Sequence, residues 1–590
     1  MLSEKEFQVL NCCRVRNVSN QREIAEATEI SLGGVNAAVK KGQNEGWITS
    51  EYEITPAGMK QLAPYKVDNA IIMAAGMSSR LAPLSYQKPK GMLLVKGEVL
   101  IERQIEQLQQ AGIRDITIVV GYMKEAFFYL EKKYGVSIMI NEEYFKYNNP
   151  STLLLTADLL KNTYICSSDD YFTENVFEPY VYRAYYAVQY TTEKTEEYCV
   201  YPDDSGLITK VTIGGEANNW YMIGHAYFSR EFSQKFVEIL KSEYETNPIM
   251  REELWEKMYM RHLKELKMHV RKYADGVINE FDSLDELRSF DEHYINNTNC
   301  SILKNICKTL HCEEKDIIKI EAIKNGLTNT SFKFECMGKQ YVYRHPGIGT
   351  DEYIHRDSEE FSMQVARELR LDDTYIFMDP VEGWKISYFV EDAHTLNYHN
   401  EKEVRQAICM IRKLHDANIH SKFDFDIIGS TKKFIQKIDK KGRSSFRDFE
   451  EIYQMMQQLY AYTEKDGVQK RLCHCDCYDP NFLVDKHDKI YLIDWEYSGN
   501  DDPANDLGTF ICCSDYTYEQ ALGILKLYFG REMTKEEKRH YLGYIAIASY
   551  YWFTWAIFQE SIGNTVGQYL YIWYKNTQFY AQEALELYRN

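Results

Sequence analysis

Residues 474–496, HCDCYDPNFLVDKHDKIYLIDWE, place more chemically active side chains in one segment than any other part of the chain. Asp476 lies near the start of this segment, Asn481 follows five residues later, and Asp494 ends the apolar run 490–493. Transfer of a γ-phosphoryl group requires a carboxylate that orients the accepting hydroxyl, and oxygen ligands for the Mg²⁺ ions that neutralise the phosphates. We therefore predict a phosphotransferase site in which Asp476 is the catalytic carboxylate and Asn481 and Asp494 hold Mg²⁺.

Three cysteines are interleaved with the acidic and basic side chains of this segment. Positions 473, 475 and 477 alternate with His474 and Asp476, so an extended backbone points the thiols to the opposite face. We expect them to be buried packing residues. A zinc site is the alternative, but it requires a second, separated pair of ligands, and none lies nearby in the sequence.

The length of 590 residues is too great for one hydrophobic core, and about three to four domains are expected. Fourteen cysteines, behind a start (MLSEKEFQVL) that does not read as a secretory leader, predict free thiols in a reducing cytoplasm. The formal charge of -19 opposes a main role in coating nucleic acid. Residues 541–558 contain no charged side chain, but Tyr, Trp, Ser and Thr are spread through their middle, so we predict a buried helix and no membrane span.

Residues 1–65 contain two short helical patterns, SNQREIAEATEI and SLGGVNAAVKKGQNEG, followed by a small hairpin pattern, WITSEYEITPAGMKQL. Leu32, Val35 and Val39 share one helical face. The segment resembles the winged helix-turn-helix of bacterial regulators. Seven Lys and Arg stand against eight Asp and Glu, and only Lys40 and Lys41 close the expected recognition helix, so we predict weak or no DNA binding.

The segment VDNAIIMAAGMSSRLAPLSYQKPKGMLLV opens the next domain at residue 67. Its apolar strand at 70–74 runs into a turn of small residues, whose backbone N–H groups can close around a triphosphate. Arg80 and Lys90 supply positive charge to the phosphates and are the predicted catalytic cations. The predicted nucleotide contacts of this turn are Ala74, Ala75, Gly76, Ser78, Ser79 and Arg80.

This turn resembles the AAG-x-G-x-R-L…KPK signature of nucleotidylyltransferases, with Ser78 where many members have a second glycine. The resemblance covers about 220 residues and is closest to the bacterial CTP:phosphocholine cytidylyltransferases, through YNNPSTLLL and INEFDSLDEL. It implies Mg²⁺ ligands at Asp169 and Asp282 and an aromatic contact from Trp255 to a trimethylammonium group. For such an aromatic, a core position is the alternative. The nucleotide contacts implied for CTP are Asn141, Asn149 and Ser151.

After a polar stretch, DEHYINNTNC, that we predict to be a linker, a second catalytic half starts near residue 300. KNGLTNTSFKFE and KQYVYRHPG predict two strands around a turn that covers a nucleotide. Arg344 stands where kinases have a phosphate-pairing lysine, and Glu359 on the next helix is placed to pair with it.

With the motif LHDANI, the kinase-like spacing of Asp476, Asn481 and Asp494, and the run IDWEYSGNDDPANDLG, this half resembles the choline kinase and aminoglycoside phosphotransferase superfamily. The resemblance implies ATP as a substrate. The residues expected at the nucleotide are Asn329, Arg344 and Glu359.

Trp552 and Trp555, in SYYWFTWAIFQ, lie three residues apart and share one helical face. The segment resembles the choline-binding helix of choline kinases. A quaternary ammonium cannot donate hydrogen bonds, so an aromatic wall and an acid, here predicted to be Glu496, would bind it. The alternative is a buried aromatic stripe.

Together these patterns predict a multidomain chain: a mainly helical winged helix (1–65), an α/β Rossmann-like nucleotidyltransferase (67–290) and an α+β protein-kinase-like phosphotransferase (300–590). The resemblances imply phosphorylation of choline by ATP and cytidylyl transfer from CTP to phosphocholine, with Mg²⁺, to supply phosphocholine for surface glycans. One alternative is the same chemistry on ethanolamine, an aminoalkylphosphonate or a sugar. Another is a ligand-sensing transcriptional regulator with inactive catalytic domains. The oligomeric state, including a homo-oligomer, stays open.

Overall fold

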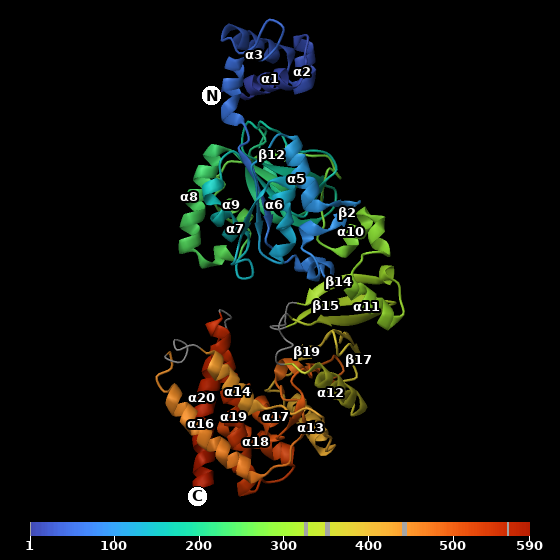
Figure 1. The fold of residues 1–590 in the computed structure, drawn as a ribbon, viewed down its shortest axis with the longest axis vertical. Coiled ribbons are helices and arrows are strands. Elements are labelled where there is room, and N and C mark those ends of the chain that lie inside the picture. The colour runs from blue at the N-terminus through green and yellow to red at the C-terminus, as the bar shows by residue number, and fades with distance from the viewer. Residues whose placement is uncertain (1, 324–328, 348–353, 439–444, 563–565) are drawn as a thin grey trace. The chain divides into compact units, whose positions relative to one another are not determined.

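The computed structural model describes residues 2–323, 329–347, 354–438, 445–562 and 566–590 (Figure 1). The chain divides into two compact units, residues 1–308 with 313–315, and residues 309–312 with 316–590. The turn 324–328 of the expected nucleotide-covering hairpin lies outside the described residues. Among the helices that the structure describes, none combines the length and the apolar character of a membrane span.

The first unit begins with the predicted winged helix, whose helices start at side-chain caps. Ser3, Asn20 and Ser31 accept hydrogen bonds from backbone N–H groups in the first turns of the helices that follow them. A bridge between Ile48 and Ile54 forms the small wing. The helices are α1 (Glu4–Val15), α2 (Gln21–Thr28), α3 (Leu32–Asn44) and α4 (Pro56–Leu62).

Aromatic side chains pack between the winged helix and the following domain of the same unit. The ring of Tyr182 stacks on Tyr65 with centroids 5.4 Å apart, and Phe7 lies against both rings. Arg183 adds an ion pair to Glu4 at 2.7 Å. The two domains therefore share an apolar contact as well as a covalent connection.

A nine-stranded sheet forms the centre of that domain, in the order β10-β9-β11-β6-β1-β4-β5, with β8 beside β11 and β12 beside β8. Strand β1 runs parallel to β4 and β6, as a Rossmann-like fold requires. Ala70 and Ile72 of β1 face one hydrophobic core and Ile71 faces the other, so both sheet faces are buried. The strands are β1 (Asn69–Ala74), β4 (Ile116–Val120), β5 (Ser137–Ile140), β6 (Thr163–Ser167), β8 (Tyr185–Thr191), β9 (Thr195–Pro202), β10 (Ile208–Gly215), β11 (Asn219–Phe228) and β12 (His269–Lys272).

Short elements surround the carboxyl ends of β1 and β6, which lie side by side in the sheet. Two strands, β7 (Asp170–Phe172) and β13 (Ile278–Glu280), pair there in antiparallel fashion. This edge is where open α/β sheets bind ligands. The helices of the domain include α5 (Leu100–Gln110), α6 (Tyr129–Tyr134), α7 (Asn149–Leu155), α8 (Arg230–Thr246), α9 (Trp255–Arg261) and α10 (Leu284–Phe290).

The stretch that we predicted to be a linker is partly packed onto this domain. Asp291 accepts a hydrogen bond from the Lys96 N–H at 2.6 Å, and the Tyr294 hydroxyl donates to the Leu94 carbonyl at 2.8 Å. These bonds correct the expectation of a free linker at its first residues, because polar composition does not reveal such partners.

The second unit contains a five-stranded sheet in the order β14-β15-β16-β18-β17. Arg344 of β16 and Lys385 of β18 are directly opposite each other in this sheet. The strands are β14 (Ile317–Ile323), β15 (Thr330–Cys336), β16 (Lys339–His345), β17 (Tyr375–Met378) and β18 (Lys385–Tyr388), and helix α12 (Arg356–Glu368) packs near β17.

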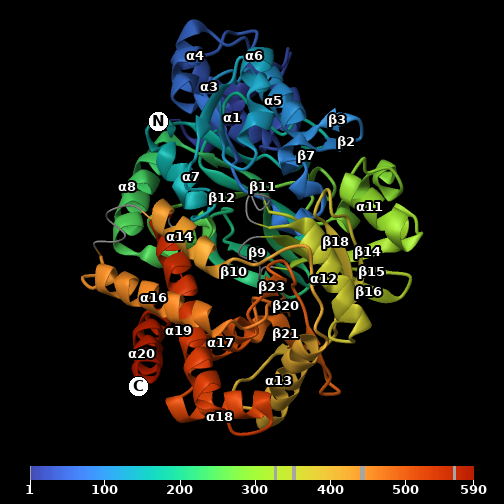
Figure 2. The same cartoon turned by 60° about the horizontal axis from the view of Figure 1, so that its bottom comes forward.

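The rest of the unit is mainly helical and is organised around α19 (Lys535–Ser561). Helices α14, α17 and α20 pack along α19 (Figure 2). Most of its residues from His540 to Ile557 are buried, so the prediction of a buried helix at 541–558 is confirmed. The other helices are α13 (Glu401–Asp416), α14 (Ile427–Lys437), α16 (Phe449–Thr463), α17 (Ala504–Cys512), α18 (Tyr518–Phe529) and α20 (Tyr569–Arg589), and the short strands are β19 (His394–Thr395), β20 (Arg471–Cys473), β21 (Phe482–Val484), β22 (Ile490–Leu492) and β23 (Gly499–Asp501).

Candidate active sites

In the first unit, Lys90 lies between the two predicted metal carboxylates. Its Nζ is 2.6 Å from Asp169 and 3.1 Å from Asp282, and Arg80 reaches the other oxygen of Asp282 at 2.9 Å. Lys90 is buried, whereas the Arg80 side chain is 75% exposed. Four predicted residues, from Arg80 to Asp282 in the sequence, therefore meet at the carboxyl edge of the sheet.

Local geometry holds these side chains in place. Asp169 occupies the turn between β6 and β7, and Asp282 follows β13 directly before Ser283, the N-cap of α10. The Glu286 side chain accepts from the Asp282 N–H at 2.7 Å. Beside Lys90, a Cβ added to Gly91 would lie 3.0 Å from the Ser168 side chain, so a larger residue there would require Ser168 to shift by a few tenths of an ångström.

Opposite charges set the protonation states at this site. Burial alone would lower the pKa of Lys90, but Asp169, Glu280 and Asp282 raise it, so the ammonium is charged. Burial would raise the pKa of Asp169, and the charge and hydrogen bond of Lys90 outweigh it and lower that pKa. Asp169 Oδ1 is buried without a hydrogen-bond partner. An ionised carboxylate with an unused oxygen fits Mg²⁺, which binds hard oxygen ligands.

The small-residue turn after β1 leaves room for a phosphate group. Ser78 has φ +50° and adopts the left-handed conformation, which glycine adopts most readily. No heavy atom outside the turn lies within 4 Å of a Cβ added to Gly76. Ala74 and Ala75 are buried, so their side chains line the interior of the domain. The Ala75 carbonyl accepts a hydrogen bond from the Tyr122 N–H at 3.0 Å. Ser79 begins the 3-10 turn that carries Arg80.

The three polar residues expected near CTP hydrogen-bond mainly within the protein. Asn141 and Ser151 are buried and are joined by a hydrogen bond of 2.9 Å from Asn141 Nδ2 to Ser151 Oγ. Asn149 Oδ1 accepts from the Trp255 N–H at 2.8 Å. In this structure all three hold the start of α7 in place, and their predicted contact with nucleotide stays a prediction.

Trp255 lies in the core. We had expected it to face a trimethylammonium group, and its burial corrects that expectation. Its side chain is 1% exposed and stacks on Tyr186, with ring centroids 5.7 Å apart. Phe228 and Phe236 enclose the other sides of the indole. The first turn of α9 directs this large apolar side chain inward, where burial stabilises it most.

Asp170 is a residue at this site that the sequence analysis passed over. Its side chain is 1% exposed, and neither carboxylate oxygen has a hydrogen-bond partner. Burial and the neighbouring charge of Asp169 raise the pKa of Asp170 well above its usual value. The sequence does show two adjacent acids at 169–170. Neighbouring side chains of a strand point to opposite faces, so the sequence did not predict that both would lie near one site.

In the second unit, Arg344 joins the predicted partner Glu359 at 2.5 Å, and the expected ion pair is confirmed. Lys385, which the sequence analysis missed, contacts Glu359 at 3.3 Å and Asp494 at 3.2 Å. Arg344 also reaches Asp494 at 3.1 Å. Burial would raise the pKa of Asp494, but these two cations lower it to about 2, so this carboxylate is ionised and suited to bind Mg²⁺.

Asp476 and Asn481 lie together on the catalytic loop. Asn481 Nδ2 donates to Asp476 Oδ2 and to the Asp476 carbonyl, both at 2.9 Å. Asp476 Oδ1 is buried and, within the described part of the chain, has no hydrogen-bond partner. Burial, with Asp494 nearby, raises the pKa of Asp476 well above its usual value. The free oxygen is available to accept a hydrogen bond from a substrate hydroxyl.

Asp506 anchors the catalytic loop and was not selected from the sequence. It accepts hydrogen bonds from the N–H groups of His474 and Cys475, at 3.0 and 2.7 Å, and contacts His415 Nε2 at 3.0 Å. Tertiary structure thus places His415 and Asp506 close to Cys473, in a group that could hold a metal ion. The hydrogen bonds already occupy Asp506 and His415, so we assign the group a structural role.

The three cysteines of the segment are buried, as predicted. Cys473, Cys475 and Cys477 are at most 2% exposed. Burial raises the pKa of each thiol well above its usual value. All fourteen cysteines of the chain are free thiols.

Glu496 lies in the cluster of charged residues around Arg344. We had predicted that it binds the cationic group of the substrate, and this contact corrects that prediction. Its Oε2 is 3.3 Å from Arg344 and accepts from Asn329 Nδ2 at 2.8 Å. Asn329 Oδ1 accepts in turn from the Gly347 N–H at 3.2 Å. Asp494 and Glu496 thus both contact Arg344 of β16 from the loop that follows β22.

Helices α19 and α20 supply an aromatic wall. Trp552 and Trp555 lie 5.6 Å apart, so the shared face that we predicted is confirmed. Trp573 of α20 stacks on Trp552 at 5.8 Å, and Tyr569 stacks on Trp573 at 5.4 Å. Trp552 and Trp555 are partly exposed. We name these four residues the aromatic wall.

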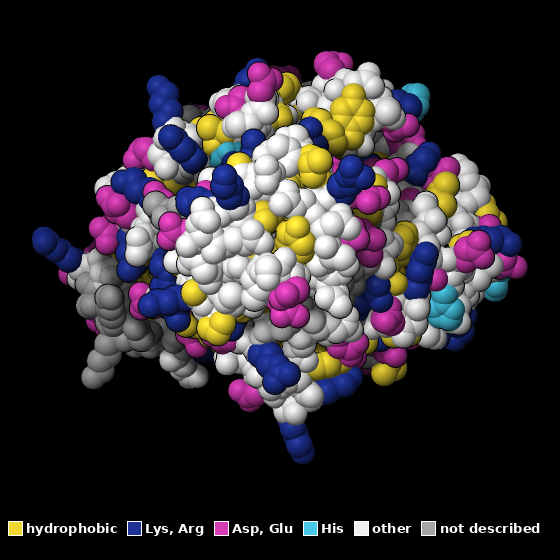
Figure 3. Space-filling view, turned by 90° about the horizontal axis from the view of Figure 1, so that it is seen from above, with side chains coloured by type: hydrophobic (Ala, Val, Ile, Leu, Met, Phe, Trp, Pro, Cys, Tyr) yellow, Lys and Arg dark blue, Asp and Glu magenta, His cyan; other side chains and the backbone are white. Residues whose placement is uncertain are grey.

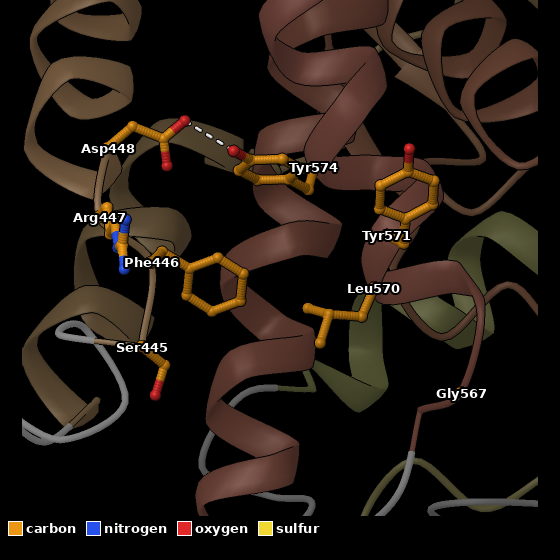
Figure 4. Close-up of a pocket in the computed structure, with 8 residues that line it drawn as sticks. All are labelled: Ser445, Phe446, Arg447, Asp448, Gly567, Leu570, Tyr571 and Tyr574. Carbon is orange, nitrogen blue, oxygen red and sulfur yellow. Dashed lines mark hydrogen bonds between the residues drawn. The ribbon is translucent and has the colours of Figure 1, made fainter.

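A cavity of about 680 Å³ opens beside the start of α20 (Figure 4). The Tyr574 hydroxyl donates to Asp448 at 2.6 Å across this cavity. None of the predicted site residues lines it. Its lining consists of Ser445, Phe446, Arg447, Asp448, Gly567, Leu570, Tyr571 and Tyr574.

Charges around the winged helix are mixed. Lys41, one of the two lysines of the expected recognition helix, pairs with Glu6 at 2.7 Å. On the face drawn in Figure 3, the Lys and Arg side chains of the described residues are interspersed with Asp and Glu and form no continuous basic patch. Weak or absent DNA binding stays a prediction.

Comparison with protein families matches three segments of the chain. Residues 7–76 match a winged-helix domain described as wHTH-PRTase associated, residues 70–161 match the MobA-like NTP transferase domain, and residues 320–547 match choline/ethanolamine kinase.

Over 223 residues the chain is 33% identical to choline-phosphate cytidylyltransferase of Streptococcus pneumoniae, covering 38% of this chain and 96% of that protein. Over 232 residues it is 34% identical to 2-aminoethylphosphonate cytidylyltransferase of Lancefieldella rimae, covering 38% and 93%. A crystal structure of choline kinase LicA from Streptococcus pneumoniae is 23% identical, with a TM-score of 0.40, covering 49% of this chain and 98% of that one.

The fold and these matches define a multidomain transferase in which a winged helix precedes a nucleotidyltransferase domain and a kinase domain. The chain belongs to the nucleotidyltransferase family that includes the choline-phosphate cytidylyltransferases, and it carries a choline/ethanolamine kinase domain after it. The predicted fold class and the predicted fusion are confirmed. The domain boundaries and the roles of single site residues stay predictions.

Proposed function

We propose that this chain makes CDP-choline in two steps. The kinase domain transfers the γ-phosphoryl group of ATP to the hydroxyl of choline, and the nucleotidyltransferase domain joins the phosphate of phosphocholine to the CMP moiety of CTP, releasing pyrophosphate. The observation that carries the choice of choline is the aromatic wall of Trp552, Trp555, Trp573 and Tyr569. Stacked aromatic faces attract a quaternary ammonium and require no hydrogen bond from it.

In the first step, Asp476 accepts the hydrogen bond of the choline hydroxyl and so orients its oxygen toward the γ-phosphorus. Arg344 and Lys385 lie on adjacent strands beside Asp494, and their charges favour bound phosphates. Mg²⁺ held by Asn481 and Asp494 would neutralise phosphate charge during transfer. As the choline oxygen bonds to the γ-phosphorus, the bond from that phosphorus to the β-phosphate oxygen breaks and ADP leaves. The buried Asp476 is placed to receive the hydroxyl proton.

In the second step, a phosphate oxygen of phosphocholine attacks the α-phosphorus of CTP, and the bond to the leaving pyrophosphate breaks. Lys90 and Arg80 supply positive charge to the phosphates. Asp169 and Asp282 would hold Mg²⁺, which offsets the negative charge of the triphosphate. Neither step needs a covalent intermediate, so alignment and electrostatics are the main contributions of the protein. The product would supply phosphocholine to a surface glycan.

A second candidate keeps both folds but changes the substrate of the nucleotidyltransferase to an aminoalkylphosphonate. The similarity at 34% identity to 2-aminoethylphosphonate cytidylyltransferase favours it. Such a substrate already carries phosphorus and would not need the kinase step, so the presence of a kinase domain in the same chain favours phosphocholine.

Incubation of the purified chain with choline, ATP and CTP, followed by ³¹P NMR, tests the proposal. Phosphocholine should form first, and CDP-choline and pyrophosphate should follow. Faster CTP consumption with 2-aminoethylphosphonate than with phosphocholine would favour the second candidate. If ADP and pyrophosphate release did not exceed that of the Asp476→Asn and Asp169→Asn variants, the enzymatic proposal would fail and a sensing role would regain support.

A further inference from the structure

Asp479 is an acid of the catalytic loop that no ion pair neutralises among the described residues. It begins the short turn Asp479–Asn481, three residues after Asp476. Its backbone N–H donates to the Tyr398 hydroxyl at 3.1 Å, which fixes the turn. Its Oδ1 is buried and has no hydrogen-bond partner among the residues that the structure describes. Burial of a carboxylate oxygen away from hydrogen-bond donors and counter-charges costs free energy, and a cationic ligand would lower this cost.

The surroundings of Asp479 are aromatic and reach the aromatic wall. Burial and then the negative charge of Asp479 raise the pKa of Tyr569, so the carboxylate lies within electrostatic range of that ring. Burial, the Cys513 thiol and Asp479 raise the pKa of Tyr398. Tyr569 itself stacks on Trp573. An acid and stacked aromatic faces are thus present in one neighbourhood of the same unit.

The other acids that we place near this region already have partners or a proposed role in the reaction. Asp448, beside the same helix α20, accepts from the Tyr574 hydroxyl (Figure 4). Glu496 pairs with Arg344, and Asp494 pairs with Arg344 and Lys385. Asp476 is the carboxylate that faces the reacting hydroxyl. Asp479 is therefore the acid of this group that remains available for a positive charge on the substrate.

We propose that Asp479 is the counter-ion of the substrate's cationic head group and makes the kinase select a charged amino alcohol over a neutral alcohol of the same shape. The inference rests on the proposed kinase reaction and deepens it. A substrate with an alcohol and an ammonium two carbons apart would place its hydroxyl at Asp476 and its cation near Asp479, one short turn further along the loop. The aromatic wall would then cover the apolar groups on the nitrogen.

A pair of alcohols that differ only in charge tests this assignment. Choline carries a trimethylammonium group, and 3,3-dimethylbutan-1-ol has a neutral tert-butyl group of the same shape. In the full-length chain, Asp479→Asn should raise the KM for choline by about tenfold, because a carboxylate facing a cation in a desolvated site is lost. The KM for the neutral alcohol should change less than about twofold, which also shows that the variant is folded. Asp488→Asn, at an exposed turn residue paired with Lys402, is the matched control and should leave both values unchanged.

Binding of tetramethylammonium, measured by calorimetry on the same variants, provides a readout that does not depend on turnover. Weaker binding to Asp479→Asn than to Asp488→Asn supports the inference, even if choline is not phosphorylated and the proposed function fails. If the wild-type chain phosphorylates choline but Asp479→Asn has unchanged KM and unchanged affinity for tetramethylammonium, the inference is overturned while the proposed function stands. Equal losses for choline and for the neutral alcohol would also overturn it, since they indicate a structural role.

Discussion

Lys90 Nζ lies 2.6 Å from the Asp169 carboxylate, and the same ammonium reaches Asp282 at 3.1 Å. The lysine thus keeps two acids together that like-charge repulsion would otherwise separate. Because these two carboxylates are also the predicted ligands of Mg²⁺, the ammonium and the metal ion would share partners at one site.

We expect Lys90→Met to lower cytidylyl transfer by about 10²-fold or more, because it removes a buried cation aimed at the phosphates. Phosphorylation of choline should continue at its normal rate. Pyrophosphate release and ADP release from the purified variant measure the two reactions separately. Lys132→Met, at an exposed position of α6 in the same domain, is the control and should retain both activities.

The two catalytic centres should be separable by single substitutions. Asp476→Asn keeps the size of the side chain but removes the group that orients the hydroxyl, and loss of such a group costs about 10²-fold to 10⁴-fold in rate. Phosphocholine added to this variant should still give CDP-choline. Asp169→Asn should have the opposite effect. A parallel loss of both reactions in a folded variant would indicate one shared centre.

Ser78 adopts φ +50°, a conformation that costs a residue with a Cβ about 1 to 2 kcal/mol relative to glycine. Ser78→Gly should therefore keep cytidylyl transfer within about threefold of wild type. Ser78→Val should lower kcat/KM for CTP by at least about fivefold, because a β-branched residue is a stronger outlier in this conformation. Titration of CTP at saturating phosphocholine measures both values. Equal activity of the Val and Gly variants would contradict a requirement for the left-handed turn.

His540 makes part of the stability of the second unit dependent on pH. Its two ring nitrogens contact Asp466 at 2.9 Å and Asp502 at 2.8 Å. Burial would lower the pKa of His540, but these two acids raise it above its ordinary value. The stabilisation is therefore fully present below about pH 6.5 and is lost as the pH rises through the raised folded-state pKa.

His540→Gln should destabilise the chain more at pH 6 than at pH 9, and the difference in unfolding temperature from wild type should shrink as the pH rises. Thermal unfolding of both proteins across this range measures the effect. His420→Gln, at an exposed position, should show no such trend. A difference that grew toward alkaline pH would show that His540 is neutral in the folded state.

Much of both sites could be predicted from the sequence because the relevant residues follow one another at short range. The Asp476 to Asn481 spacing lies within one loop, and Arg80 and Lys90 flank one turn after β1. In such segments the covalent chain itself limits how far apart the side chains can be. The cysteines at 473, 475 and 477 are buried as predicted, but His474 and Asp476 are buried too and Cys475 adopts φ +66°, so the expected extended alternation does not explain their burial.

The tertiary structure decided which distant residues complete the sites. Lys385 reaches Asp494 because the register of β16 and β18 places it opposite Arg344, and that register is not encoded in either strand alone. Arg344 of the same sheet contacts Glu496, which we had predicted to bind the substrate. Among the described residues, Asp479 Oδ1 has no hydrogen-bond partner. Trp255 turned out to be a core residue because its neighbours Tyr186, Phe228 and Phe236 come from other elements. Burial and ion pairing depend on contacts between segments far apart in the chain, and such contacts exist only after the chain has folded.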